Sequence, residues 1–237
     1  INPFHVITTL EADEEGGSSK VNNFAVHLQF LEEFFRVALP GIDAQALEYL
    51  NNLIVELYKN KGIGFFTDFS SLTAADYPVF DDLYSLIQEK LAGATIEYDV
   101  MNLRVLSNFI SKFASNGRDS NLWNGESTLT VKENFTVFNF QSLLANKNGV
   151  IANAQMLLVL KWLDNEIIKN RDFNIKYGTN RKIIVAIDEA HVFIDPKYPV
   201  ALDFMYQLAK RIRKYNGMQI VITQNIKDFV GTQEIIR

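Results

Sequence analysis

The sequence predicts an α/β protein, in which a parallel β-sheet with helices is joined to an all-α block. Two observations predict the sheet: the apolar runs at 183–187 and 219–223 are rich in β-branched residues, and each stops at polar side chains. Short runs of this kind are typical of parallel strands buried on both faces. A third observation predicts the α block, because residues 24–116 show successive helical periodicities with no strand pattern between them.

Four helices are expected in the all-α block. Their apolar residues recur at helical spacing, and Asp43 has the position of an N-cap for the second helix. Pro78 places the start of the third helix near Tyr77, because proline is tolerated only in a first turn. The expected helices span 24–39, 44–61, 74–91 and 99–114.

Strands and helices alternate after Gly117. This order is typical of a right-handed parallel α/β sheet. The predicted elements are a strand at 135–140, a helix at 150–170, a strand at 183–187, a helix at 198–215, a strand at 219–223 and a helical turn from Asn225. Near the start of the chain, the acidic residues, glycines and serines at 10–23 predict a solvated loop.

Composition excludes several functions. The 237 residues leave room for one large domain or for a domain with an insertion. They include no cysteine, which excludes disulfides and thiolate metal sites. No apolar run approaches the roughly 18 residues of a membrane span, and the first residues lack a signal pattern. A net charge of −5 gives no global electrostatic reason to bind DNA.

Two carboxylates follow the first apolar strand. The order IIVAI then Asp188 and Glu189 is the pattern of a Walker B strand. Asp188 would hold Mg²⁺ through water, because octahedral magnesium commonly keeps its waters and takes one protein carboxylate. Glu189 could act as the general base that polarises the attacking water. The alternative is that one of the two caps a helix.

Thr223 and Gln224 end the second apolar strand. Ligands of open α/β sheets bind beyond the carboxyl ends of the strands. A polar pair there can bond a γ-phosphate or the lytic water and so sense the nucleotide. Ordinary turn chemistry is the alternative for this pair taken alone.

Four basic residues, Lys210, Arg211, Arg213 and Lys214, lie between the strands in the last helical turn. They complement the helix dipole there. The alternative is that an arginine reaches the γ-phosphate of a neighbouring subunit. His191 has no second histidine at a useful spacing, so no zinc site is expected.

The phosphate-gripping part of a nucleotide site is missing from the sequence. No GxxxxGK[ST] segment occurs, so no backbone nest or lysine is available for the phosphates. Either the strand pair is a relic, or the chain begins downstream of its own phosphate loop. The start at Ile1, without methionine or processed signal, favours the second explanation.

The chain resembles the type IV secretion and conjugative-transfer ATPases of the VirB-four class, relatives of the HerA and FtsK motors. The most specific landmark is the last, where basic residues, Asn-Gly, a strand ending in Thr-Gln and a later Asp recur together. The landmarks are INPF at 1–4, LWNGES at 122–127, TVFNF at 136–140, IIVAIDEAH at 183–191 and RIRKYNGMQIVITQNIKDF at 211–229.

The resemblance implies a RecA-like P-loop NTPase with an inserted all-α subdomain. The ATPase core would comprise 1–23 and 117–237, and the subdomain 24–116. The resemblance implies ATP and Mg²⁺ as cofactors and a hexamer, with other secretion-channel proteins as partners. It would lie in the bacterial cytoplasm, peripheral to the inner face of the membrane. The intact protein would hydrolyse ATP, and residues 1–237 alone would bind it poorly.

The resemblance also assigns residues. Asp188 and Glu189 match the Walker B pair, Gln224 matches the sensor glutamine, and Arg211 and Arg213 match the basic segment of the inter-subunit site. His191 departs from the family, which usually has a bulky aromatic residue after Asp-Glu-Ala.

Three alternatives to a secretion ATPase stay open. DEAH at 188–191 is also the signature of a nucleic-acid helicase, although the next strand ends in Thr-Gln where a Ser-Ala-Thr-like segment is expected. A DNA translocase of the HerA or FtsK kind is the second alternative. A non-hydrolytic scaffold that docks partners through its α block is the third.

Overall fold

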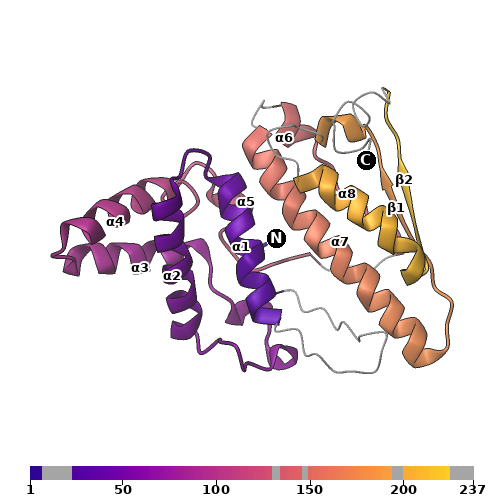
Figure 1. The fold of residues 1–237 in the computed structure, drawn as a ribbon, viewed down its shortest axis with the longest axis horizontal. Helices are drawn as coiled ribbons and strands as arrows, with labels where there is room; N and C mark the ends of the chain where they lie inside the picture. The colour runs from indigo at the N-terminus through magenta and orange to yellow at the C-terminus, as the bar shows by residue number, and fades with distance from the viewer. Residues whose placement is uncertain (7–22, 130–133, 146–148, 194–199, 225–237) are drawn as a thin grey trace. The chain divides into compact units, whose positions relative to one another are not determined.

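The computed structural model describes residues 1–6, 23–129, 134–145, 149–193 and 200–224. The chain divides into two compact units, one formed by Ile1–Thr8 with Lys20–Phe140 and the other by Thr9–Ser19 with Gln141–Arg237 (Figure 1). The predicted loop at 10–23, apart from Asn23, and the predicted turn from Asn225 lie outside the described residues.

The first unit is helical, as predicted for the α block. Helix α2 starts at the predicted cap, where the Asp43 carboxylate accepts a 2.7 Å hydrogen bond from the N–H of Ala46. Neighbouring helices in the sequence pack together, α1 on α2 and α3 on α4, and α2 also contacts α3 and α4. The elements are α1 (Asn23–Ala38), α2 (Ala44–Asn60), η1 (Phe69–Ser71), η2 (Ala74–Asp76), α3 (Phe80–Gly93), α4 (Glu97–Ile110) and α5 (Ser120–Trp123).

The start of α3 differs from the prediction. The helix begins at Phe80 and not near Tyr77. Tyr77 precedes Pro78, and the proline ring keeps such a residue extended, here at φ −85° and ψ 147°. The first turn is closed instead by Asp82, whose carboxylate accepts a 2.9 Å hydrogen bond from the N–H of Val79.

Aromatic rings fill the centre of the first unit. The rings of Phe4 and Phe80 meet edge to face with centroids 5.1 Å apart, and those of Phe113 and Trp123 are also 5.1 Å apart. All four side chains are buried. Such pairs add to the free energy of burial. The aromatic stripes of the α block therefore form a core, as the sequence predicts.

Buried hydrogen bonds fix the first residues of the chain in this unit. Asn2 donates its side-chain amide to the carbonyl of Pro78 at 2.8 Å. Tyr58 donates its hydroxyl to the carbonyl of Phe4, and His27 Nε2 lies 2.9 Å from the same hydroxyl. Burial raises the pKa of Tyr58 well above its usual value, so the hydroxyl keeps its proton.

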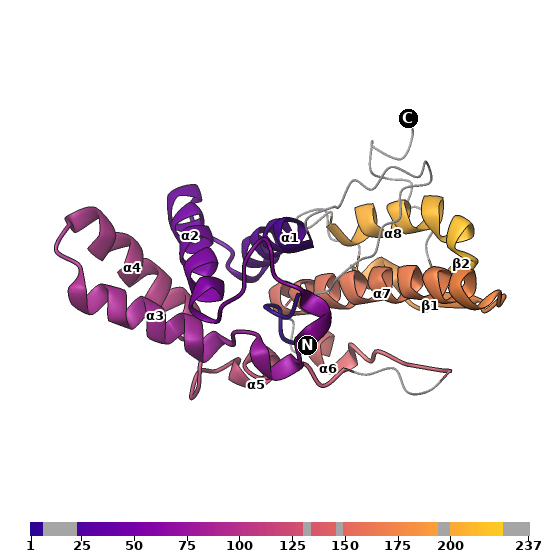
Figure 2. The same cartoon turned by 90° about the horizontal axis from the view of Figure 1, so that it is seen from below.

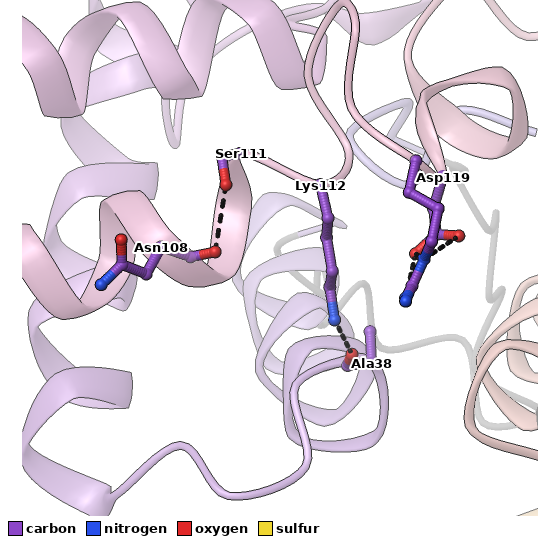
Figure 3. A network of polar contacts seen from close by, with 6 residues as sticks. Ala38, Asn108, Ser111, Lys112 and Asp119 are labelled. Atoms are coloured by element: carbon purple, nitrogen blue, oxygen red, sulfur yellow. Dashed lines mark hydrogen bonds and ion pairs between the residues drawn. The ribbon is translucent and has the colours of Figure 1, made fainter.

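The loop after α4 closes the carboxyl end of α1. Lys112 Nζ donates to the carbonyl of Ala38 at 3.3 Å, where a positive charge complements the helix dipole (Figure 3). Burial lowers the pKa of Lys112. The backbone passes so close to Gly117 that a Cβ there would lie 2.3 Å from the carbonyl oxygen of Ser111, and only glycine fits.

The second unit contains a parallel pair of strands. Their register runs from Ile183 opposite Gly217 to Ile187 opposite Val221. A small core of Ile167, Val185, Leu208 and Ile212 joins α7, β1, α8 and η4. Helices α7 and α8 lie side by side in this unit (Figure 2). The elements are α6 (Gln141–Ala145), α7 (Gly149–Tyr177), β1 (Ile183–Ile187), η3 (Ala190–Phe193), α8 (Val200–Arg211), η4 (Ile212–Tyr215) and β2 (Gly217–Val221).

Three boundaries of helices and strands in this unit differ from the prediction. Helix α7 extends seven residues beyond the predicted end at 170. The helix predicted at 198–215 is α-helical only to Arg211, and its last turn is the 3₁₀ helix η4. Asn216 caps η4 in a left-handed conformation with φ 60°. Strand β2 starts at Gly217, two residues before the predicted start.

The strand predicted at 135–140 is wrong. Within the described residues the sheet has two strands, in the order β1-β2. Phe135 and Val137 are 83% and 70% exposed, and the structure assigns no strand to 135–140.

The expectation that both faces of the strands are buried is also wrong for the described residues. Ile184, Met218 and Ile220 share one face of the sheet, and Ile184 is 60% exposed. The opposite face of β1 contacts the helices through Ile183, Val185 and Ile187. The described helices thus cover one face of the sheet.

Among the described helices, none is both long and apolar enough to cross a membrane. The compact units do not coincide with the predicted domains, since the first unit takes in residues 1–8 and extends to Phe140. A compact unit is not the same as a functional core, so the division into 1–23 with 117–237 and 24–116 stays a prediction.

Candidate functional site

The carboxyl ends of β1 and β2 lie together because the strands are parallel and in register. Pairing continues past the last strand residues: the N–H of Ile222 donates to the carbonyl of Ile187, and the N–H of Ala190 donates to the carbonyl of Ile222, both at 2.9 Å. These bonds fix the polar residues after each strand at one edge of the sheet, as the sequence predicts.

Asp188 and Glu189 form a tight turn at this edge. Asp188 is exposed, and its Oδ1 accepts a 2.9 Å hydrogen bond from the N–H of Glu189. Glu189 has a left-handed backbone with φ 48°, which is rare outside glycine, asparagine and aspartate. An N-cap has an extended backbone, so this conformation argues against a capping role for Glu189 in front of η3.

The carboxylate of Glu189 lies between two side chains. Its Oε1 accepts a 2.8 Å hydrogen bond from the side-chain amide of Gln224, which follows β2. Its Oε2 lies 3.2 Å from Nδ1 of His191. The structure therefore brings the predicted base and the predicted sensor into direct contact.

Thr223 occupies the position between the end of β2 and Gln224, and it is half-buried. It lies at the same edge of the sheet as Asp188, and its role toward a nucleotide stays a prediction. The hydroxyl of Thr223 and the carboxylate of Asp188 are the kinds of oxygen group expected at a magnesium and phosphate site.

Arg211 and Arg213 are not part of this cluster. Arg211 is the last residue of α8 and Arg213 lies in η4, so both precede the amino end of β2. The carboxylates of Asp188 and Glu189 follow the carboxyl end of β1. A strand of five residues spans about 16 Å at about 3.3 Å per residue. Neither arginine is placed to act on the carboxylate edge of its own sheet.

The two arginines also differ from each other. Arg211 Nη2 donates to Asp164 Oδ1 of α7 at 2.9 Å, and the side chains are 35% and 16% exposed, so the pair is partly shielded from water. Arg213 is exposed on η4. A local structural role therefore fits Arg211, and the inter-subunit role of Arg213 stays a prediction.

The residues fit one half of a magnesium-nucleotide site. An exposed carboxylate at Asp188 suits a hydrated Mg²⁺, which takes few protein ligands. The phosphates have no matching element, because residues 1–237 contain no GxxxxGK[ST] segment. The arrangement can orient a water and hold a hydrated cation, and it needs a phosphate-binding loop from other residues.

His191 is a candidate site residue that the sequence pattern does not reveal. The sequence offers no second histidine for a zinc site, and it marks His191 as a departure from the bulky aromatic residue that the family usually has there. In the part of the chain that the structure describes, no group of three metal-binding side chains is found. The spacing of His191 from Glu189 could have indicated the contact, because a residue two positions later, beyond a tight turn, can face back toward the Glu189 carboxylate.

The comparisons with known proteins agree with the geometry. The family described as the TraG P-loop domain matches residues 45–237. The solved structure of VirB4 of Thermoanaerobacter pseudethanolicus is 30% identical in sequence and matches with a TM-score of 0.78, covering 99% of this chain. The chain spans 56% of that VirB4 chain. No curated protein sequence matches. These matches confirm the resemblance to secretion and conjugative-transfer ATPases of the VirB4 class.

Proposed function

The chain belongs to the TraG P-loop domain family, and on that premise we propose that it is the hydrolytic part of an ATPase that powers a type IV, conjugation-type secretion machine. The observation that supports the proposal best is the contact between Glu189 and Gln224. A carboxylate and an amide from adjacent strand ends meet where a nucleotide binds in open α/β sheets. This pairing supplies a general base and a side chain that can report the presence of the γ-phosphate.

Each residue of the site has a proposed role. Asp188 holds Mg²⁺ through water, Glu189 accepts the proton of the attacking water, and Thr223 and Gln224 face the γ-phosphate. Arg213 is proposed to act across a subunit interface. Magnesium, when bound, neutralises charge on the phosphates during their transfer.

The assembly is proposed from the family. The intact protein is a hexamer in the bacterial cytoplasm, at the inner face of the membrane beside other channel proteins. Residues 1–23 and 117–237 belong to its RecA-like core, and 24–116 form an inserted subdomain. Because residues 1–237 lack a phosphate loop, we expect them to gain little thermal stability from Mg-ATP. A large shift in a thermal unfolding assay would contradict that expectation.

The substitution Glu189→Gln tests the proposal in the complete ATPase, phosphate loop included. ATP binding should persist, and hydrolysis should slow at least about a hundredfold because the positioned base is lost. Glu166→Gln is the matched control, since Glu166 pairs with Lys169 on α7 away from the site. Unchanged turnover in Glu189→Gln would refute the role of the base. Hydrolysis that requires nucleic acid would favour the helicase or DNA-translocase alternatives.

A further inference from the structure

We propose that His191 is a positioning residue: its Nδ1–H and the amide of Gln224 together hold the carboxylate of Glu189, so that Oε1 is the oxygen that faces the attacking water. The proposal rests on the proposed function, because it concerns the base of the same site. In this role His191 acts as a hydrogen-bond donor, and not as a zinc ligand or as an aromatic ring that only fills space.

The contact between His191 and Glu189 is shielded from water. Glu189 Oε2 and His191 Nδ1 lie 3.2 Å apart, and each atom is almost completely inaccessible to solvent. The Glu189 side chain as a whole is 47% exposed. Its exposed surface therefore lies on atoms other than Oε2, and Oε2 is the oxygen turned away from solvent.

The shielding decides where His191 carries its proton. As placed, the two atoms lie 3.2 Å apart without forming a hydrogen bond, and neither has a hydrogen-bond partner among the described residues. Without a proton on Nδ1, a ring lone pair would face a carboxylate lone pair. A buried acceptor left without a donor is unfavourable. A proton on Nδ1 removes the conflict after a small adjustment of the ring, so the site favours the Nδ1–H form.

The backbone supports the same arrangement. Glu189 adopts its left-handed φ of 48°, and the carboxylate of Asp188 accepts from its N–H in this turn. Strained conformations of this kind persist where surrounding contacts hold them, and they concentrate at functional sites. Here the turn presents the side chain of Glu189 between Gln224 and His191.

Two donors on one carboxylate leave a defined position for water. Gln224 occupies one lone pair of Oε1, and His191 covers Oε2. A carboxylate oxygen accepts more than one hydrogen bond, so Oε1 keeps a lone pair for the proton of a water molecule. A base held in one orientation gains rate by keeping the reactants aligned.

The proton position can be measured directly on residues 1–237. Nitrogen-15 NMR of the imidazoles, at a pH where the rings are neutral, should show the Nδ1–H tautomer for His191. In Glu189→Ala the ring should return to the commoner Nε2–H tautomer, while His5 and His27 stay unchanged as internal controls. An Nε2–H tautomer in the unmodified chain, or no response to Glu189→Ala, would overturn the proposal.

Kinetics of the complete ATPase separate positioning from a merely structural role. His191→Phe keeps an aromatic ring without a donor, and it should lower kcat about ten- to hundredfold with KM for ATP unchanged. His191→Asn places an amide donor near the position of Nδ1 and should restore most of the rate. Equal rates for His191→Phe and the unmodified enzyme would show that the position only fills space, which overturns the proposal.

A double substitution distinguishes failure of the proposed role of His191 from failure of the proposed ATPase function. In the Glu189→Gln background, His191→Phe should cause no further loss, because a positioning residue acts through its partner. Full additivity would contradict the proposal. If Glu189→Gln alone leaves hydrolysis unchanged, the proposed function fails, and the NMR measurement still decides whether His191 holds Glu189.

Discussion

Asp81 joins the first turn of α3 to the loop that follows α4. Its carboxylate accepts hydrogen bonds from both the N–H and the hydroxyl of Ser115, and its own N–H donates to Asn124. Burial raises the pKa of Asp81, but hydrogen bonds from Ser115 and Asn124 outweigh burial and hold the pKa below its usual value. The ionised carboxylate is thus the form that stabilises this loop.

The depressed pKa predicts how Asp81→Asn changes stability with pH. The contribution of Asp81 is present above the pKa of an unfolded aspartate, about 3.9, and is lost as the pH falls through the lower pKa of the folded state. Asp81→Asn should therefore lower Tm at pH 7, and the difference from the unmodified chain should shrink below about pH 4.

The two tryptophans make the measurement specific to one unit. Trp123 lies in the first unit and Trp162 in the second, so a Trp162→Phe background reports unfolding of the first unit by fluorescence. Glu89→Gln, an exposed residue of the same helix, is the control. A Tm difference that is constant between pH 7 and pH 3 would show that the charge of Asp81 does not matter.

Helices α7 and α8 are joined by the ion pair of Asp164 and Arg211, next to the core of Ile167, Leu208 and Ile212. An ion pair that is partly shielded from water has a stronger electrostatic attraction than an exposed one. Most of that favourable energy is offset by the hydration that the two charges lose. The pair gives Arg211 a structural role inside one subunit.

Arg211→Ala should lower the free energy of unfolding of the second unit by about 1 kcal/mol, because Asp164 loses its partner. Arg213→Ala, two residues on and exposed, should change it by less than about 0.5 kcal/mol. Denaturant unfolding followed by Trp162 in a Trp123→Phe background measures both. Equal effects would remove the structural distinction between the two arginines.

The complete assembly is where Arg213 should matter. If it reaches the γ-phosphate of a neighbour, adding Arg213→Ala subunits to the unmodified hexamer should depress activity more than in proportion to their fraction. The loss follows because each altered subunit disables the site of an unmodified neighbour.

Arg211→Ala subunits, matched for stability, are the control for that mixing experiment. Activity that falls in simple proportion to the added Arg213→Ala subunits would assign Arg213 a local role. The experiment requires the complete ATPase, since the two arginines and the carboxylates lie at opposite ends of β2 and β1 in one subunit.

Much of the fold follows from local patterns. Periodic apolar residues and the Asp43 cap predicted the helices of the first unit, and the apolar runs predicted β1, β2 and their parallel pairing. The pattern failed at 135–140, because alternating apolar residues form a strand only where a neighbouring strand offers hydrogen bonds. It also failed for the outer sheet face, where apolar residues such as Ile184 are exposed.

The sequence by itself determined that Asp188, Glu189, Thr223 and Gln224 share one edge of a sheet, because the ends of parallel strands meet there whatever the side chains do. Only the tertiary structure decided that His191 faces the carboxylate of Glu189 and that Arg211 pairs with Asp164. Those contacts depend on a left-handed turn and on the packing of α7 against α8. Side-chain direction and long-range packing are not encoded in any short run of residues, so spacing alone could not distinguish Arg211 from Arg213.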